Sequence, residues 1–101
     1  MGGFGTTGAA AAGAELSALG RGPGASDRPT IVAVGAELAV PIYGQVIAVA
    51  TALGESGLHN LEHGDRDSLG LFQQRPSQGW GTPEQILDPR YAATQFYEHL
   101  L

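Results

Sequence analysis

The chain of 101 residues contains no cysteine, which excludes disulfide bonds, thiolate metal ligands and thiol nucleophiles. It also contains no lysine: its five basic residues are all arginines, and they stand against ten acidic residues for a net charge of −5. The arginines are scattered along the sequence, whereas nucleic-acid binding needs a basic patch that displaces counterions from phosphates. Nucleic acid is therefore not expected as a partner.

Long apolar segments are missing as well. The longest apolar run, around Val46–Leu53, is much too short to cross a bilayer. Residues 1–14 lack the positively charged start of a secretory signal peptide. If the protein acts outside the cytoplasm, its export signal lies on a longer parent chain, or a dedicated machine delivers it.

What the sequence does contain is enough for one small domain. Residues 1–27 are rich in glycine, alanine and small polar residues, which predicts a linker or a disordered segment. Because alanine is the best helix former, a short helix over Ala9–Leu19 is the alternative. The folded domain is expected over residues 28–101.

Two helices are predicted at the start of this domain. Helical spacing of apolar residues indicates the first helix, which Pro41 should end: Ile31, Val34, Leu38 and Ala39. The second helix should run from Ile42 to about Gly54, with apolar side chains nearly all round. Such a helix is normally buried, so it is expected to be the centre of the domain.

The second half of the domain is more polar and richer in turn-forming residues than the first half. Weak alternation over Ser68–Gln74 predicts a small β-hairpin or an irregular β-like loop. Pro76–Pro83 reads as a loop whose Trp80 either packs over the core or stacks on a sugar face. A last helix should follow, with Asp88 as its N-cap and Pro89 in its first turn. The fold class is thus mainly α, with a small β-hairpin.

Glu55 is the leading catalytic candidate, since it directly follows the most apolar helix. The negative pole of the helix dipole and apolar surroundings both favour the protonated form of a carboxyl group. An acid that keeps its proton near neutral pH can protonate the leaving oxygen of a glycosidic bond. A glutamate after a helix is more often a surface residue without a catalytic role. The choice between these two interpretations of Glu55 therefore depends on the neighbouring sequence.

Three short sequence motifs, one around Glu55 and two after it, follow one another in a characteristic order. Ala-Leu-Gly-Glu-Ser-Gly-Leu stands at Ala52–Leu58, Asp-Ser-Leu-Gly-Leu-Phe-Gln-Gln-Arg-Pro at Asp67–Pro76, and Ile-Leu-Asp-Pro at Ile86–Pro89. In this order and spacing, residues 30–101 resemble the soluble lytic transglycosylase and goose-type lysozyme group. The likeness is greatest to the lysozyme-like domains of actinobacterial and phage cell-wall hydrolases. That group continues into further helices, which are missing from this chain.

The resemblance implies a lysozyme-like α+β fold and an enzyme that cleaves the glycan strands of peptidoglycan. Glu55 would be the general acid/base, and no cofactor or metal would be needed. The reaction would end either in an anhydro ring or in hydrolysis, for which Asp65 and Asp67 are the nearby candidates for a second carboxylate. The expected location is extracytoplasmic, in the cell wall, or phage-borne. The expected substrate-binding residues are Ser56, Gly70, Leu71, Phe72, Gln73 and Tyr97.

The role of Tyr97 depends on the geometry of the last helix. Phe96 and Tyr97 are adjacent and so cannot share a helix face. Phe96 is expected in the core, and Tyr97 should face either the cleft or water.

Other readings of the polar residues carry less weight. The group His59, Glu62, His63, Asp65 and Asp67 fits no zinc or calcium spacing, so a solvated acidic loop with an Arg66 ion pair is predicted instead. Ser56 has no base and orienting group around it, which argues against a serine nucleophile. The alternative function is a non-catalytic cell-wall-binding or structural module, for example in a phage tail. The sequence does not indicate an oligomeric state.

Overall fold

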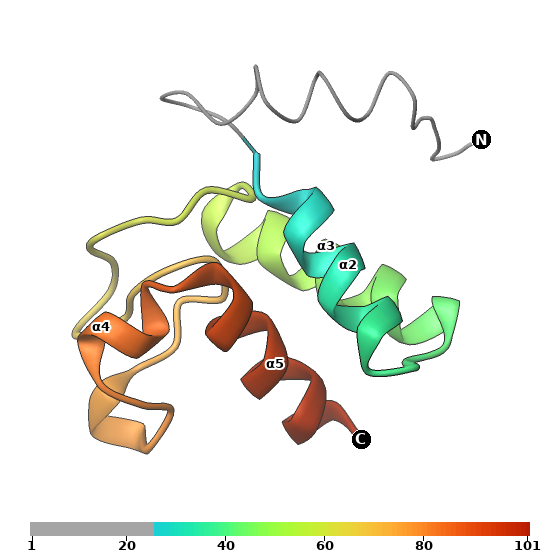
Figure 1. The fold of residues 1–101 in the computed structure, drawn as a ribbon. Coiled ribbons are helices and arrows are strands. Elements are labelled where there is room, and N and C mark those ends of the chain that lie inside the picture. The colour runs from blue at the N-terminus through green and yellow to red at the C-terminus, as the bar shows by residue number, and fades with distance from the viewer. Residues whose placement is uncertain (1–25) are drawn as a thin grey trace.

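The computed structural model describes residues 26–101, and these fold into helices and loops with no β-strand among them (Figure 1). The elements in chain order are α2 (Arg28–Glu37), α3 (Ile42–Ser56), the 3-10 helix η1 (Pro76–Gln78), α4 (Pro83–Ile86) and α5 (Pro89–Leu100). The mainly helical class is therefore confirmed. The linker, disorder or short helix predicted for the N-terminal segment falls on residues 1–25, outside the described part.

Local sequence chemistry sets the helix boundaries. Pro41, at φ −58° and ψ 155°, holds extended backbone immediately before α3. Gly57, at φ 68°, ends α3 in the left-handed conformation that glycine adopts most readily. At the start of α5 the Asp88 side chain accepts a hydrogen bond from the Arg90 N–H, at 3.0 Å, with Pro89 in the first turn. The predicted N-cap of the last helix is thus confirmed.

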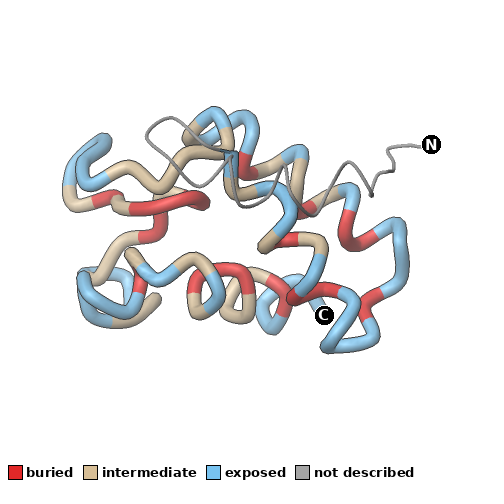
Figure 2. Tube along the Cα trace, turned by 45° about the horizontal axis from the view of Figure 1, so that its top comes forward, coloured by how far each residue is buried: buried red, intermediate tan, exposed pale blue. Residues whose placement is uncertain are grey.

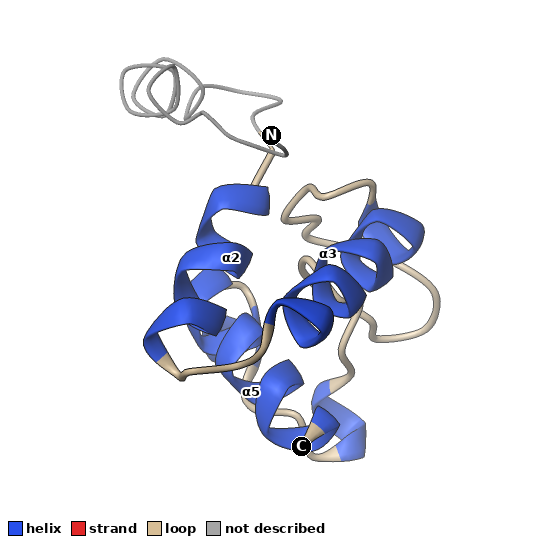
Figure 3. Cartoon of the chain, turned by 90° about the vertical axis from the view of Figure 1, so that its right-hand side faces the viewer, coloured by secondary structure: helices blue, strands red, loops and turns tan. Residues whose placement is uncertain are grey.

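The core lies where α2, α3 and α5 meet the turn around Leu71. Figure 3 shows how these three helices are arranged. α5 packs against α2, α3 and α4, and α2 also packs against α3. Buried positions recur along the inner sides of these segments in Figure 2. The fully buried side chains are Ile31, Ala48, Ala52, Leu71, Ile86, Ala92, Ala93 and Tyr97.

The prediction that α3 is buried on all sides is wrong. One side of the helix is buried through Gly44, Gln45, Ala48 and Ala52. The opposite side is open, with exposed fractions of 71% for Ile42, 77% for Tyr43, 54% for Val46 and 57% for Leu53. The cause is that the described elements, α2, α5 and the turn around Leu71, cover α3 from one side only.

The predicted β-hairpin is reduced to a single antiparallel bridge. Leu69 and Gln74 exchange main-chain hydrogen bonds of 2.9 and 3.0 Å, and no strand extends from them in residues 26–101. Gly70 turns the chain at φ 80°. A Cβ atom there would lie 2.9 Å from the main-chain oxygen of Ile86, so only glycine fits this close approach. The tight turn at residues 69–74 takes the place of the hairpin.

No helix in residues 26–101 is long and apolar enough to span a membrane.

Candidate active site

Glu55 occupies the last turn of α3, on the inner side of that helix. It follows Ala48 and Ala52 at spacings of seven and three residues, which places the three residues on one face. The two alanines are fully buried, whereas Glu55 is exposed because the core ends before the last turn. The apolar surroundings predicted for this carboxyl group are therefore not formed by the described residues. Glu55 instead stands at the open end of the inner face.

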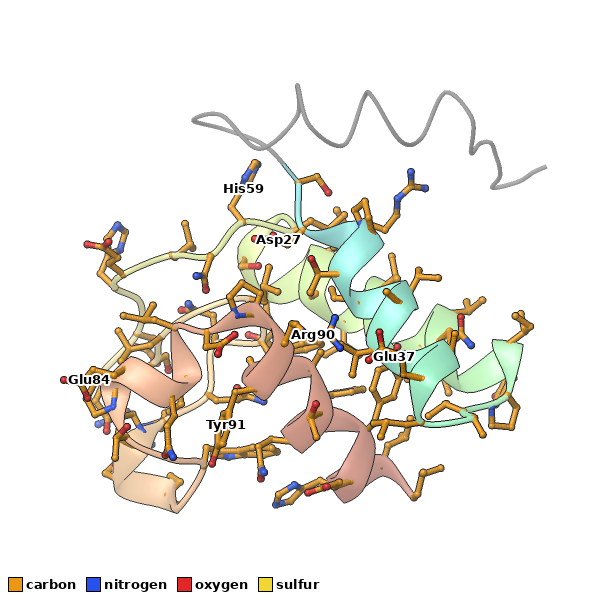
Figure 4. All side chains as sticks on the ribbon, viewed as in Figure 1. Asp27, Glu37, His59, Glu84, Arg90 and Tyr91 are labelled. Atoms are coloured by element: carbon orange, nitrogen blue, oxygen red, sulfur yellow. The ribbon has the colours of Figure 1, made fainter. Side chains whose placement is uncertain are left out.

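The carboxylate of Glu55 has no hydrogen bond or ion pair within residues 26–101. Some other carboxylates of the fold are engaged in structural contacts. Glu37 pairs with Arg90, which joins the end of α2 to the start of α5 (Figure 4), and Asp88 caps α5. Glu55 is thus free to contact a ligand, which a structurally committed carboxylate is not.

Ser56 fastens the neighbouring turn to the end of α3. Its hydroxyl lies 2.7 Å from the main-chain oxygen of Leu71 and 3.1 Å from that of Ala52, and it donates to these acceptors. The hydroxyl proton is therefore committed within the protein. Ser56 thereby holds the turn at residues 69–74 at the end of α3, and its predicted contact with substrate stays a prediction.

Most side chains of this turn face inward. Leu71 is fully buried and Phe72 is 6% exposed, and the ring of Phe72 stacks on Phe96 with centroids 4.6 Å apart. Gly70 is buried as well. The side chains of Leu71 and Phe72 therefore form the packed back of the turn, and the substrate contacts expected of Gly70, Leu71 and Phe72 stay predictions.

Gln73 is the half-buried exception in the turn. Its Nε2 donates to the main-chain oxygen of Gly70 at 3.1 Å and, more weakly, to that of His63 at 3.4 Å. A Cβ atom on Gly64 would fall on the Gln73 amide, so the loop and this side chain are closely packed. Gln73 thereby ties the turn to the loop before it and keeps a polar side chain at the surface near the end of α3.

Tyr97 lies in the core, which corrects the prediction that it faces the cleft or water. Its side chain is fully buried, and its hydroxyl donates to the main-chain oxygen of Ile31 at 2.8 Å. Burial raises the pKa of Tyr97 to about 12. Phe96, predicted as core, is only partly buried at the edge of the cluster. Gly35 in α2 is the sequence feature that indicates this burial, because a residue with a Cβ atom would leave no room for the tyrosine. A Cβ atom there would lie 2.6 Å from the Tyr97 oxygen.

Asp67 is a structural residue. One carboxylate oxygen accepts from Arg75 Nε at 2.6 Å, and the other accepts from the Ser77 N–H at 2.9 Å. These contacts hold the pKa of Asp67 well below its usual range. The predicted Arg66 ion pair is replaced by this Arg75 pair, which anchors the acidic loop to η1. Asp67 is thus engaged, and Asp65 remains as an exposed carboxylate on the loop.

Two further predictions concern metals and Trp80. No group of three or more metal-ligating side chains comes together within the part of the chain that the structure describes. The indole of Trp80 packs on the His99 ring of α5, with centroids 4.1 Å apart. The packing role considered for Trp80 is the one that this contact favours.

Comparisons with known proteins give no match, whether with family models, curated sequences or solved structures. The likeness to the lytic transglycosylase group therefore stays a prediction from the sequence words around Glu55. The geometry itself offers one free carboxylate at a helix end. Beside it lies a turn that Ser56 and Gln73 hold in place.

Proposed function

We propose that this chain cleaves the glycan strands of peptidoglycan, as a lytic transglycosylase or a muramidase, with Glu55 as general acid/base. In this reaction the carboxyl group protonates the glycosidic oxygen as the bond to the sugar breaks. The resulting carboxylate then takes a proton, either from the muramyl hydroxyl that closes an anhydro ring or from an attacking water. The place of action would be the cell wall.

The observation that carries this proposal is the position of Glu55. It continues the buried Ala48–Ala52 face of α3 to the open end of the fold, without a partner among residues 26–101. A catalytic acid needs this combination of a rigid support and a free carboxyl group. Two hydrogen bonds support it: Ser56 binds the turn at residues 69–74 to the end of α3, and Gln73 braces that turn. In this proposal the turn forms one wall of the glycan cleft.

The alternative is a non-catalytic cell-wall-binding or structural module. The exposure of Glu55 favours it, because this side chain lies open to solvent at the end of α3 and is not enclosed by the apolar residues of the core. In this reading glycan would bind along the turn and the end of α3 without bond cleavage. The free carboxylate would serve as a hydrogen-bond acceptor for sugar hydroxyl or amide groups.

The two functions separate in a digestion of purified peptidoglycan, with the soluble products analysed by liquid chromatography and mass spectrometry. The enzyme should release anhydro-muropeptides or reducing muropeptides, which differ in mass by one water. Glu55→Gln keeps the size of the side chain and should abolish release. Glu84→Gln is the matched control, because Glu84 is an exposed acid on α4.

Product release that Glu55→Gln leaves unchanged would refute the assignment of Glu55. Sedimentation of the chain with peptidoglycan, without product from either protein, would support the binding module instead. Circular dichroism of each variant shows whether loss of product reflects loss of fold.

A further inference from the structure

One side of α3 forms a continuous apolar surface that no described element covers. We call it the outer stripe, and it consists of Ile42, Tyr43, Val46, Ala50, Leu53 and Gly54, all exposed. These residues recur at spacings of three, four and seven positions and so share one helix face. It lies opposite the face of Ala48 and Ala52, which is buried in the core.

Burial of the outer stripe does not require the desolvation of any charged side chain. The segment from Ile42 to Gly54 contains no aspartate, glutamate, lysine or arginine. A partner that covers it would therefore remove apolar groups from water and would not have to strip water from an ionised side chain. Its large exposed side chains are of the kind that marks interaction surfaces on small proteins.

Gly54 is a second, independent observation at the same surface. Glycine is disfavoured inside a helix relative to alanine. None of the described residues demands it here, since a Cβ atom at this position would meet no atom of residues 26–101 within 4 Å and its φ is not positive. Gly35 and Gly44, in contrast, are crowded, because a Cβ atom on either would meet a side chain at 2.6 Å. The empty space at Gly54 suits the close approach of another molecule.

The apolar residues of the stripe run along the whole length of α3, as packing against a copy of the same helix requires. Ile42 and Tyr43 stand at its N-terminal end, and Leu53 and Gly54 stand at its C-terminal end. In an antiparallel pair of helices related by a twofold axis, the N-terminal end of each stripe meets the C-terminal end of the other. Tyr43 of one copy would then lie over Gly54 of the other.

The available area lies in the range of a weak dimer. If the whole exposed area of Ile42, Tyr43, Val46 and Leu53 is covered, each copy buries about 500 Å², or roughly 1,000 Å² for the pair. Weak protein interfaces bury less than about 1,200 Å² in total, and stable ones bury about 1,200–2,000 Å². We propose that this chain forms a symmetric dimer in which the outer stripes of two α3 helices pack against each other in antiparallel orientation.

The dimer leaves the proposed active site open. Glu55 lies on the inner face of α3, away from the outer stripe, so packing of the stripe does not cover its carboxylate. The dimer and the cleavage of glycan strands are therefore independent proposals. A dimeric protein without activity would contradict the proposed cleavage and leave the dimer standing. An active monomer would contradict the dimer and leave the proposed cleavage standing.

The experiment is sedimentation equilibrium of the full chain over a range of micromolar concentrations. A mass approaching twice the 10.4 kDa of one chain is expected. Val46→Glu places a charge in the middle of the stripe and should weaken dimerisation by about tenfold or more. Ala36→Glu places the same charge at an exposed position of α2 and is the matched control, with no expected effect.

Gly54→Leu is the sharper variant, because it separates the interface from the fold. The added side chain enters open space and is a better helix former, so the thermal midpoint of the monomer should be kept or raised. It also fills the space that Tyr43 of the second copy would occupy, so the dimer should weaken. This variant tests the proposal even if Val46→Glu fails to fold.

Three results would overturn the proposal. The first is a wild-type chain that stays monomeric at every concentration, which would leave the stripe to a different partner. The second is a dimer that both stripe variants leave intact, and the third is a dimer that Ala36→Glu weakens equally.

Discussion

Replacement of Tyr97 by phenylalanine tests whether this residue supports the core or contacts a ligand. The change removes one hydroxyl group and keeps the ring. In the structure that hydroxyl donates to the main-chain oxygen of Ile31, 2.8 Å away, inside a fully buried contact between α5 and α2. If Tyr97 faced the cleft or water, as the sequence alone predicts, the same change would have little effect on stability.

The magnitude follows from what each partner loses. A typical intramolecular hydrogen bond contributes about 0.5–1.5 kcal/mol. The Ile31 oxygen also stands in α2, where the N–H four residues later is its regular helical partner. It is therefore not left without a donor, and a loss of about 1 kcal/mol is expected. For a domain of this size that loss lowers the thermal midpoint by roughly 4–8 °C.

The pH dependence gives the same experiment a second readout. Burial raises the pKa of Tyr97 to about 12 from an ordinary value of 10.0. A raised pKa means that the contribution of the neutral hydroxyl is complete below pH 10 and is lost as the pH rises towards 12. The stability difference between the wild type and Tyr97→Phe should therefore shrink over that interval.

The assay is urea denaturation followed by circular dichroism at neutral pH and at several values above pH 10, with peptidoglycan sedimentation in parallel. The structural role predicts lower stability with unchanged binding of peptidoglycan. A variant with the stability of the wild type but weakened binding would refute it and return Tyr97 to the cleft.

Two more predictions concern single positions outside the proposed catalytic group. Gly35→Ala should destabilise the fold by about 1–3 kcal/mol in urea denaturation, because its Cβ atom would lie 2.6 Å from the Tyr97 oxygen; an unchanged midpoint would contradict this contact. Asp67→Asn should lose the contribution of the Arg75 pair. That contribution is present above the ordinary carboxyl pKa of 3.8 and declines as the pH falls below it. The thermal midpoint of the wild type should exceed that of the variant at neutral pH, and this difference should shrink in acid. A difference that does not change with pH would contradict a contribution of the Asp67–Arg75 pair.

The parts of the fold that could be predicted from sequence depend on local chemistry. Pro41 directly precedes α3, and Asp88 with Pro89 starts α5, because a cap or a proline acts on its own backbone within a few residues. The end of the first helix is different: α2 stops at Glu37, before the predicted Leu38 and Ala39, so Pro41 does not end it. The position of Glu55 at a helix end follows from the same local pattern. These features need no knowledge of how the helices pack.

The remaining features depend on contacts between distant segments. An all-apolar helix pattern does not reveal which side of α3 is covered, and so the exposure of Val46 and Leu53 was missed. Adjacent residues such as Phe96 and Tyr97 compete for the core, and the outcome depends on the gap that Gly35 leaves in α2. For the same reason Asp67 pairs with Arg75 across a turn rather than with its neighbour Arg66.

The main-chain hydrogen bond from the Asp27 N–H to the Leu58 oxygen, 3.0 Å long, holds the residue before α2 against the loop that follows α3. That contact lies just past the C-terminal end of α3, three residues along the chain from Glu55. The start of α2 and the last turn of α3 are therefore joined at one end of the domain. A change that weakens this junction would loosen the support of Glu55 although it touches neither Glu55 nor the turn at residues 69–74.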